Sequence, residues 1–62
     1  MSDVELGTTF TDPYLDVPGI VFEVNAKVDD ELWQAEIVSG PESSLGVMDL
    51  YEEAHILLFR TE

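Results

Sequence analysis

Two runs rich in strand-forming residues, Ile20 to Val28 and Glu31 to Val38, constrain the fold of this chain more than any other feature. Alternation of apolar and polar side chains within such runs is typical of a strand with one face on a core. The acidic pair Asp29-Asp30 separates the runs. The sequence therefore predicts an antiparallel hairpin that turns at this pair.

A turn at Asp29-Asp30 fixes which residues lie opposite each other. The predicted pairs on the core face are Phe22 with Ile37, Val24 with Ala35, and Ala26 with Trp33. The predicted pairs on the other, more polar face are Val21 with Val38, Glu23 with Glu36, Asn25 with Gln34, and Lys27 with Leu32. Both central positions of a type I′ turn need positive φ, which Asp accepts less readily than Gly. A four-residue loop that keeps the same register is therefore an equal alternative.

The C-terminal third predicts a helix, with a strand interpretation as its competitor. After a loop at Ser39 to Ser44, apolar residues recur at spacings of three and four, as on an amphipathic helix: Val47, Leu50, Tyr51, Ala54, Leu57 and Leu58. The alternative divides the segment into strands Leu45 to Tyr51 and His55 to Phe59, which would complete a small all-β barrel of SH3-like type. Gly46 and the run from Ile56 to Phe59 favour that alternative.

We therefore expect an α+β fold in which the hairpin packs against a C-terminal amphipathic helix. The expected core is Phe22, Val24, Trp33, Ile37, Leu50, Ala54, Leu57 and Leu58. Residues 1–19 carry turn signals at Asp12-Pro13 and Pro18-Gly19 and only a weak strand pattern around Val4 to Phe10. Sixty-two residues leave room for one core, so residues 1–62 are expected to form a single domain without disulfides, since there is no cysteine.

Residue types that support catalysis or ligand binding are scarce. His55 is the only histidine and no cysteine is present. The chain therefore has few residues that could form the pair of nucleophile and base needed for nucleophilic catalysis. The acidic run Asp29, Asp30, Glu31 lacks the spacing of a calcium loop and is interpreted as a solvated turn. We expect a protein that is not an enzyme, with no catalytic residue, metal site or cofactor, and His55 as an ordinary surface or rim histidine.

The net charge is the feature that bears most on function. Fourteen carboxylates face one lysine and one arginine, for a formal charge of −12. A mass of 6.9 kDa corresponds to roughly 4,000 Å² of surface, or on the order of one net negative charge per 330 Å². Such a surface repels nucleic acid and anionic membranes and attracts basic proteins. The expected partner is thus a basic nucleic-acid-binding protein, without direct binding to nucleic acid or membrane.

In charge, length and lack of cysteine, the chain resembles the small phage-encoded DNA-mimic inhibitors of host defence, such as anti-restriction and anti-CRISPR proteins. The resemblance implies a stoichiometric blocker that acts in the host cytoplasm and occupies a groove lined with Lys and Arg. The charge also fits two alternatives. In the first, the acidity is environmental, as in halophiles. In the second, the chain is an acidic antitoxin or assembly subunit for a basic partner.

The expected contact surface consists of acidic side chains with aromatic anchors. Its residues are Glu23, Asp29, Asp30, Glu31, Glu36, Glu42, Asp49, Glu52, Glu53, Tyr14 and Tyr51. Tyrosine is included because binding hot spots favour it. Glu23 opposite Glu36 is the most informative pair, because like charges facing each other across two strands are destabilising. The pair therefore suggests a face that meets a cationic surface, and two side chains that splay into water are an equal alternative. The start of the chain has no signal-peptide pattern, so a cytoplasmic protein is expected, and a homodimer is compatible with the sequence.

Overall fold

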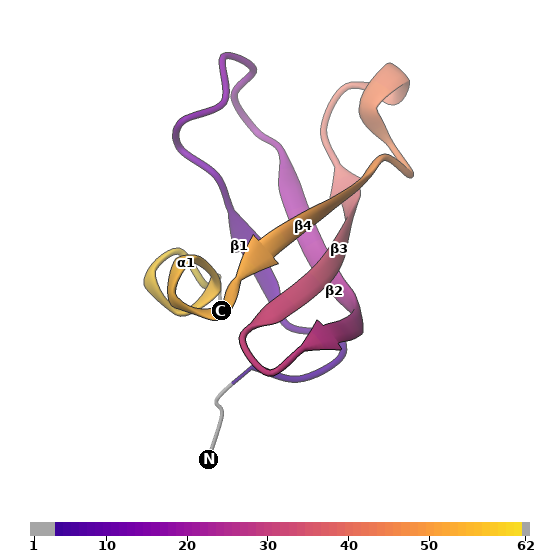
Figure 1. Ribbon diagram of the computed structural model, residues 1–62. Helices are drawn as coiled ribbons and strands as arrows, with labels where there is room; N and C mark the ends of the chain where they lie inside the picture. Colours follow the sequence, from indigo (N-terminus) through magenta and orange to yellow (C-terminus); the bar gives the residue numbers. More distant parts are fainter. Residues whose placement is uncertain (1–3, 62) are drawn as a thin grey trace.

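The computed structural model describes residues 4–61, which form a twisted antiparallel sheet and one short helix (Figure 1). The elements are β1 (Thr9–Thr11), β2 (Val21–Asp29), β3 (Leu32–Ser39), the 3₁₀ turn η1 (Glu42–Ser44), β4 (Met48–Glu52) and α1 (Glu53–Leu58). The strands lie in the order β1-β2-β3-β4, so each pairs with its neighbour in sequence. The class is α+β, as expected from the sequence.

The central part of the predicted hairpin register is confirmed. Phe22 lies opposite Ile37, Glu23 opposite Glu36, and Val24 opposite Ala35. Phe22 and Val24 point to the core, as the alternation predicted. One face of this pair of strands is therefore apolar and buried, while the other carries the facing glutamates.

The register predicted for the end of the hairpin is wrong. A register shift after Val24 brings Trp33 opposite Lys27 instead of Ala26. A second shift after Lys27 makes the tip Asp30-Glu31 instead of Asp29-Asp30. No residue other than glycine has positive φ, so the type I′ turn is absent from residues 4–61. Bulges supply the local twist instead, and they place the Lys27 ammonium 5.3 Å from the centre of the Trp33 ring.

The opposite end of the sheet likewise departs from the predicted pairs. Val21 lies opposite Ser39 where Val38 was expected. Gly46 donates its N–H to the Ile37 carbonyl at 2.9 Å, with φ of +84°, and so turns the chain into β4. A residue with a side chain would be strained at that angle.

The C-terminal segment is half strand and half helix, which corrects the predicted long helix. The strand alternative was right for β4, whereas its second strand is replaced by α1. Four expected core residues are exposed instead: Leu50, Ala54, Leu57 and Leu58. Ile56 is the helical residue that is fully buried. The five residues of β4 make too short a stretch for periodicity to distinguish a strand from a helix, and pairing with the open edge of β3 decides between them.

The core lies on the inner face of the sheet and includes Ile56 of α1. Its buried residues are Val4, Phe10, Ile20, Phe22, Val24, Trp33, Ala35, Ile37 and Ile56, with Tyr51 packed against them. The main contacts of α1 are with β1 and β4. No helix among residues 4–61 has the length and apolar character needed to cross a membrane.

The chain after α1 returns to β1. Arg60 forms a bridge with Phe10, the Thr11 N–H donates to the Phe59 carbonyl at 3.1 Å, and the Thr61 N–H donates to the Thr9 carbonyl at 2.9 Å. These contacts place a fifth short extended segment beside β1, on the side away from β2.

Candidate partner-binding surface

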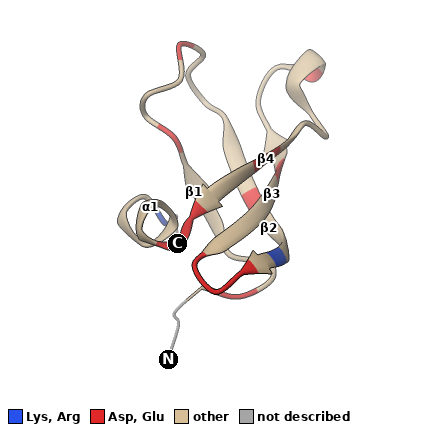
Figure 2. Cartoon of the chain, in the orientation of Figure 1, with Lys and Arg blue, Asp and Glu red and all other residues tan. Residues whose placement is uncertain are grey.

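One end of the molecule gathers five carboxylates from two separate parts of the chain. We call this surface the acidic end, and its residues are Asp29, Asp30, Glu31, Glu52 and Glu53. The first three come from the end of β2 and the β2–β3 tip, and the last two from the junction of β4 with α1 (Figure 2). The Glu53 N–H donates to the Glu31 carbonyl at 2.8 Å and so holds the two parts together. The sequence predicted each residue, but not that they are neighbours.

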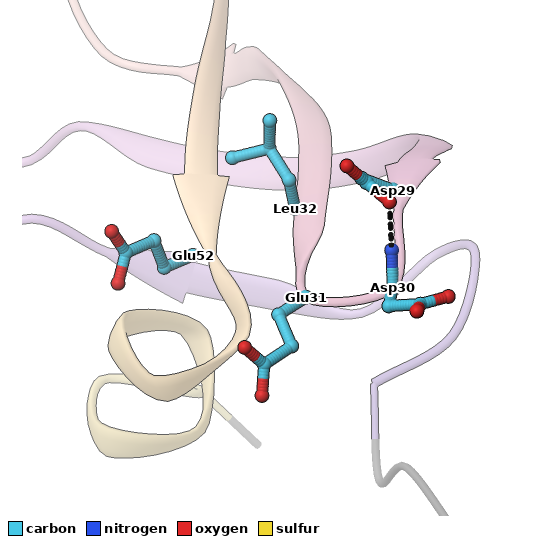
Figure 3. Close-up of a pocket in the computed structure, with 5 residues that line it drawn as sticks. All are labelled: Asp29, Asp30, Glu31, Leu32 and Glu52. Carbon is cyan, nitrogen blue, oxygen red and sulfur yellow. Dashed lines mark hydrogen bonds between the residues drawn. The ribbon is translucent and has the colours of Figure 1, made fainter.

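The acidic end is hollowed in two adjoining places. An open hollow of about 540 Å³ is lined by Asp29, Asp30, Glu31, Leu32 and Glu52 (Figure 3). A smaller one of about 200 Å³ shares Glu31 and Glu52 and is completed by Glu53, Ala54 and Leu57. Neither hollow is lined by a lysine or an arginine.

The carboxylates that line the larger hollow point in different directions. In Figure 3 the side chains of Asp30, Glu31 and Glu52 fan outward, and Asp29 accepts the Asp30 N–H at 2.8 Å. Within residues 4–61, no group of three or more acidic or histidine side chains is arranged to hold a metal ion. This geometry suits the display of negative charge to a large basic surface more than the chelation of one small cation.

The outer face of the sheet carries a second acidic feature. Glu23 and Glu36 lie directly opposite each other, as the sequence predicted. Glu36 in turn lies opposite Met48 on β4. Beside them, Gln34 donates from Nε2 to the Asn25 Oδ1 at 3.0 Å. The outer face thus combines a repelling pair of carboxylates with an ordered amide pair.

Three other predicted contact residues lie apart from the acidic end. Glu42 is in η1, which follows the far end of β3 (Figure 1). Tyr14 is 79% exposed in the β1–β2 loop and meets the ring of Phe59 edge-on, with centroids 5.9 Å apart. Asp49 lies on β4 opposite Ala35 and accepts the N–H of the next residue in the strand.

Tyr51 serves the core instead of an exposed surface. Its ring packs edge-on against Phe10 and Phe22, each with centroids 4.9 Å apart. Its hydroxyl donates to the Asp12 Oδ2 at 2.9 Å. Burial, and then the hydrogen bond and charge of Asp12, raise the pKa of Tyr51 well above its usual range. A partner that used this ring as an anchor would have to break the contact with Asp12.

His55 ties α1 to the rest of the core. Its ring lies 4.8 Å from both Tyr51 and Phe59, centroid to centroid. Its Nε2 lies 3.1 Å from the Thr11 carbonyl, so this nitrogen carries the proton and donates it. The half-buried ring therefore connects α1, β4 and β1. The sequence predicted an ordinary surface or rim histidine, and a half-buried position fits the rim.

Sequence reasoning missed two apolar residues on the exposed side of β4. Met48 and Leu50 are each 50% exposed, and Leu50 had been expected in the core. The signal that identifies them is the alternation of the strand interpretation, in which Met48, Leu50 and Glu52 share one face.

In a comparison with known proteins, no protein-family model, curated protein or solved structure matched the chain. The geometry and charge of the molecule are therefore the basis for assigning a function.

Proposed function

We propose that this protein is a non-enzymatic inhibitor that binds the basic nucleic-acid-binding surface of a partner protein and excludes its DNA or RNA. The observation that carries the proposal is the acidic end, where Asp29, Asp30, Glu31, Glu52 and Glu53 cover two adjoining hollows with no Lys or Arg among the lining residues. The host cytoplasm is the proposed place of action, as for phage anti-CRISPR and anti-restriction proteins.

The acidic end presents negative charge as a nucleic acid does. Duplex DNA carries one charge per about 1.7 Å of its axis, and its binding proteins meet it with Lys and Arg. The Glu53 to Glu31 backbone hydrogen bond joins the two backbone segments that carry the carboxylates, so less backbone ordering is needed on binding. Association should be fast and steered by charge, and it should weaken as salt rises.

Exposed apolar side chains favour a protein partner over an environmental origin of the acidity. Among residues 4–61, twelve large hydrophobic side chains are substantially exposed, including Met48 and Leu50. High concentrations of excluded salts strengthen apolar association, so a surface adapted to molar salt would be expected to expose fewer of them. The same side chains are suited to the centre of a protein interface.

The test is affinity capture with the purified protein as bait in a bacterial lysate, at about 0.1 M and about 1 M salt, where the Debye length falls from roughly 10 Å to 3 Å. The captured protein is identified by mass spectrometry and then offered labelled duplex DNA or RNA. We expect capture at low salt only, and loss of nucleic acid from the partner when this protein is added.

A matched pair of variants locates the contact. Asp30→Asn with Glu31→Gln removes two charges at the acidic end, whereas Asp16→Asn with Glu42→Gln removes two charges in the loops at the other end. We expect the first pair to weaken capture about tenfold and the second to leave it within twofold. Equal effects of the two pairs, or a partner that keeps its nucleic acid in the ternary mixture, would refute the proposal. The second result would support an antitoxin or assembly role instead.

A further inference from the structure

The outer edge of β4 is open. The sheet order ends at β4, and no strand among residues 4–61 pairs with its side away from β3. The opposite end of the sheet is covered, because the segment around Arg60 lies beside β1. An open edge presents backbone donors and acceptors that can pair with an additional strand.

The hydrogen bonds show which groups of β4 face outward. The Ile37 N–H donates to the Val47 carbonyl at 2.9 Å, and the Glu53 N–H donates to the Glu31 carbonyl at 2.8 Å, so the odd-numbered residues at both ends of β4 face β3. Because these directions alternate along a strand, the backbone groups of Met48, Leu50 and Glu52 point away from β3. These residues also share the outer face of the sheet.

The protection of this edge against strand addition is negative charge. Natural edges are protected by short length, charged side chains, proline or a bulge. β4 is short and carries Asp49 and Glu52, but it has no lysine or proline and pairs with β3 without a register shift, so its charge does not oppose a basic strand. One outward donor is covered locally, because the Asp49 Oδ1 accepts the Leu50 N–H at 2.8 Å. This side chain belongs to the adjacent residue, and its rotation would free the N–H for an incoming carbonyl.

Charge indicates what the edge can accept. Asp49 and Glu52 are part of β4, and Glu36 lies beside it on β3. A second copy of this chain would bring a further formal charge of −12 to the same place and would be repelled. A basic extended segment would be attracted, and the half-exposed side chains of Met48 and Leu50 would pack against its apolar residues.

We propose that β4 binds an extended basic segment of the partner protein as an additional strand, with backbone pairing along Met48, Leu50 and Glu52. This rests on the proposed function for the basic character of the partner and adds a specific mode of contact to it. The acidic end attracts a basic surface without regard to its conformation, while the β4 edge selects an extended segment that alternates basic and apolar side chains.

The test uses a short end-blocked peptide of alternating lysine and valine, and the same peptide methylated on every backbone nitrogen. Both have the same charge, but the methylated peptide cannot donate backbone hydrogen bonds. We expect the first peptide to bind at low salt and to slow amide hydrogen exchange at Met48, Leu50 and Glu52. We expect methylation to weaken binding about tenfold or more, since several hydrogen bonds are lost together.

Protein variants supply a second measurement. Leu50→Pro removes an outward N–H that β3 does not use, and Leu50→Ala removes the same apolar side chain while keeping the N–H. We expect the proline variant to bind the unmethylated peptide more weakly than the alanine variant. If the proline variant does not fold, the comparison of the two peptides decides alone.

Two results would overturn the proposal. One is equal binding of both peptides, or binding of neither, which would exclude backbone pairing. The other is a dimer at about 1 M salt in sedimentation velocity with protected amides in β4, which would identify a second copy as the occupant. Either result leaves the capture experiment with Asp30→Asn and Glu31→Gln unaffected, so failure at the β4 edge is distinguishable from failure of the proposed function.

Discussion

The inner and outer faces of the sheet both carry apolar side chains, but only the inner face buries them. On the inner face, Phe10 stacks on Phe22 with centroids 5.3 Å apart and contacts Tyr51 edge-on. On the outer face, Met48 and Leu50 stay half exposed beside a pair of glutamates. We therefore expect the side chains of the inner face to determine stability, and those of the outer face and the acidic end to determine binding. Most substitutions should then affect one property and leave the other unchanged.

Phe10→Ala should have the largest effect on stability. Phe10 is fully buried at the centre of the aromatic cluster, and truncation of a buried phenylalanine costs about 3–5 kcal/mol. That is comparable to the whole stability expected of so small a domain. Urea denaturation followed by circular dichroism should show little or no folded protein. A cooperative transition near that of the wild type would mean that the inner face does not hold the fold.

Tyr51→Phe should have a smaller effect that depends on pH. Loss of the hydrogen bond to Asp12 is expected to cost about 1 kcal/mol at neutral pH. Because the folded state raises the pKa of Tyr51, its contribution is fully present below about pH 10, the ordinary pKa of tyrosine, and is lost as the pH rises above that value.

Urea denaturation between pH 8 and about 11 measures this difference. The wild type should lose stability above about pH 10 more steeply than Tyr51→Phe. Tyr14→Phe is the control, since the side chain of Tyr14 is 79% exposed, and it should keep the slope of the wild type. Parallel curves for all three proteins would contradict the buried role of Tyr51.

Glu23→Gln should change stability and binding in opposite directions. It removes the repulsion across the sheet with Glu36 and should raise stability by about 0.2–1 kcal/mol at low salt. The gain should shrink as salt screens the pair. Association with the basic partner should slow down. Asp16→Asn, which removes one charge from the β1–β2 loop, is the control, and an equal gain from it would assign the effect to net charge alone.

Met48→Ala should have the smallest effect on stability, about 0.5 kcal/mol or less, because the side chain is half exposed. The comparison is Ile56→Ala, which truncates a fully buried side chain and should cost about 2–5 kcal/mol. Peptide or partner binding should fall with Met48→Ala. A destabilisation similar to that of Ile56→Ala would show that the outer face is also part of the core.

The sequence predicted the centre of the hairpin because two independent signals agreed there. Alternation placed Phe22 and Val24 on the core face, and the acidic turn brought the second run back against the first. The bulges could not be predicted from the sequence. They depend on how the two strands adjust to a tip in which no residue has positive φ. Once the register shifts, the partner of Trp33 changes from Ala26 to Lys27.

The C-terminal segment was mispredicted because its apolar residues fit two periods. Leu50 and Leu57 contribute to a helical stripe, yet β4 puts Leu50 on the outer face and α1 buries Ile56 instead. The choice depends on the open edge of β3, a tertiary contact that local periodicity does not encode. For the same reason, the acidic end was predicted residue by residue, but the proximity of Glu31 and Glu53 was not.

The contacts between β1 and the segment at residues 59–61 have a consequence for the order of folding. The Thr9 and Thr61 hydroxyls are hydrogen-bonded across fifty-two positions of the chain, so a long loop must close before this pairing gains any energy. The β2–β3–β4 meander involves much shorter separations and can form first. We therefore expect β1 and the C-terminal segment to dock last and to open first as one unit, with the amides of Thr11 and Thr61 exchanging together and faster than those of β2 and β3.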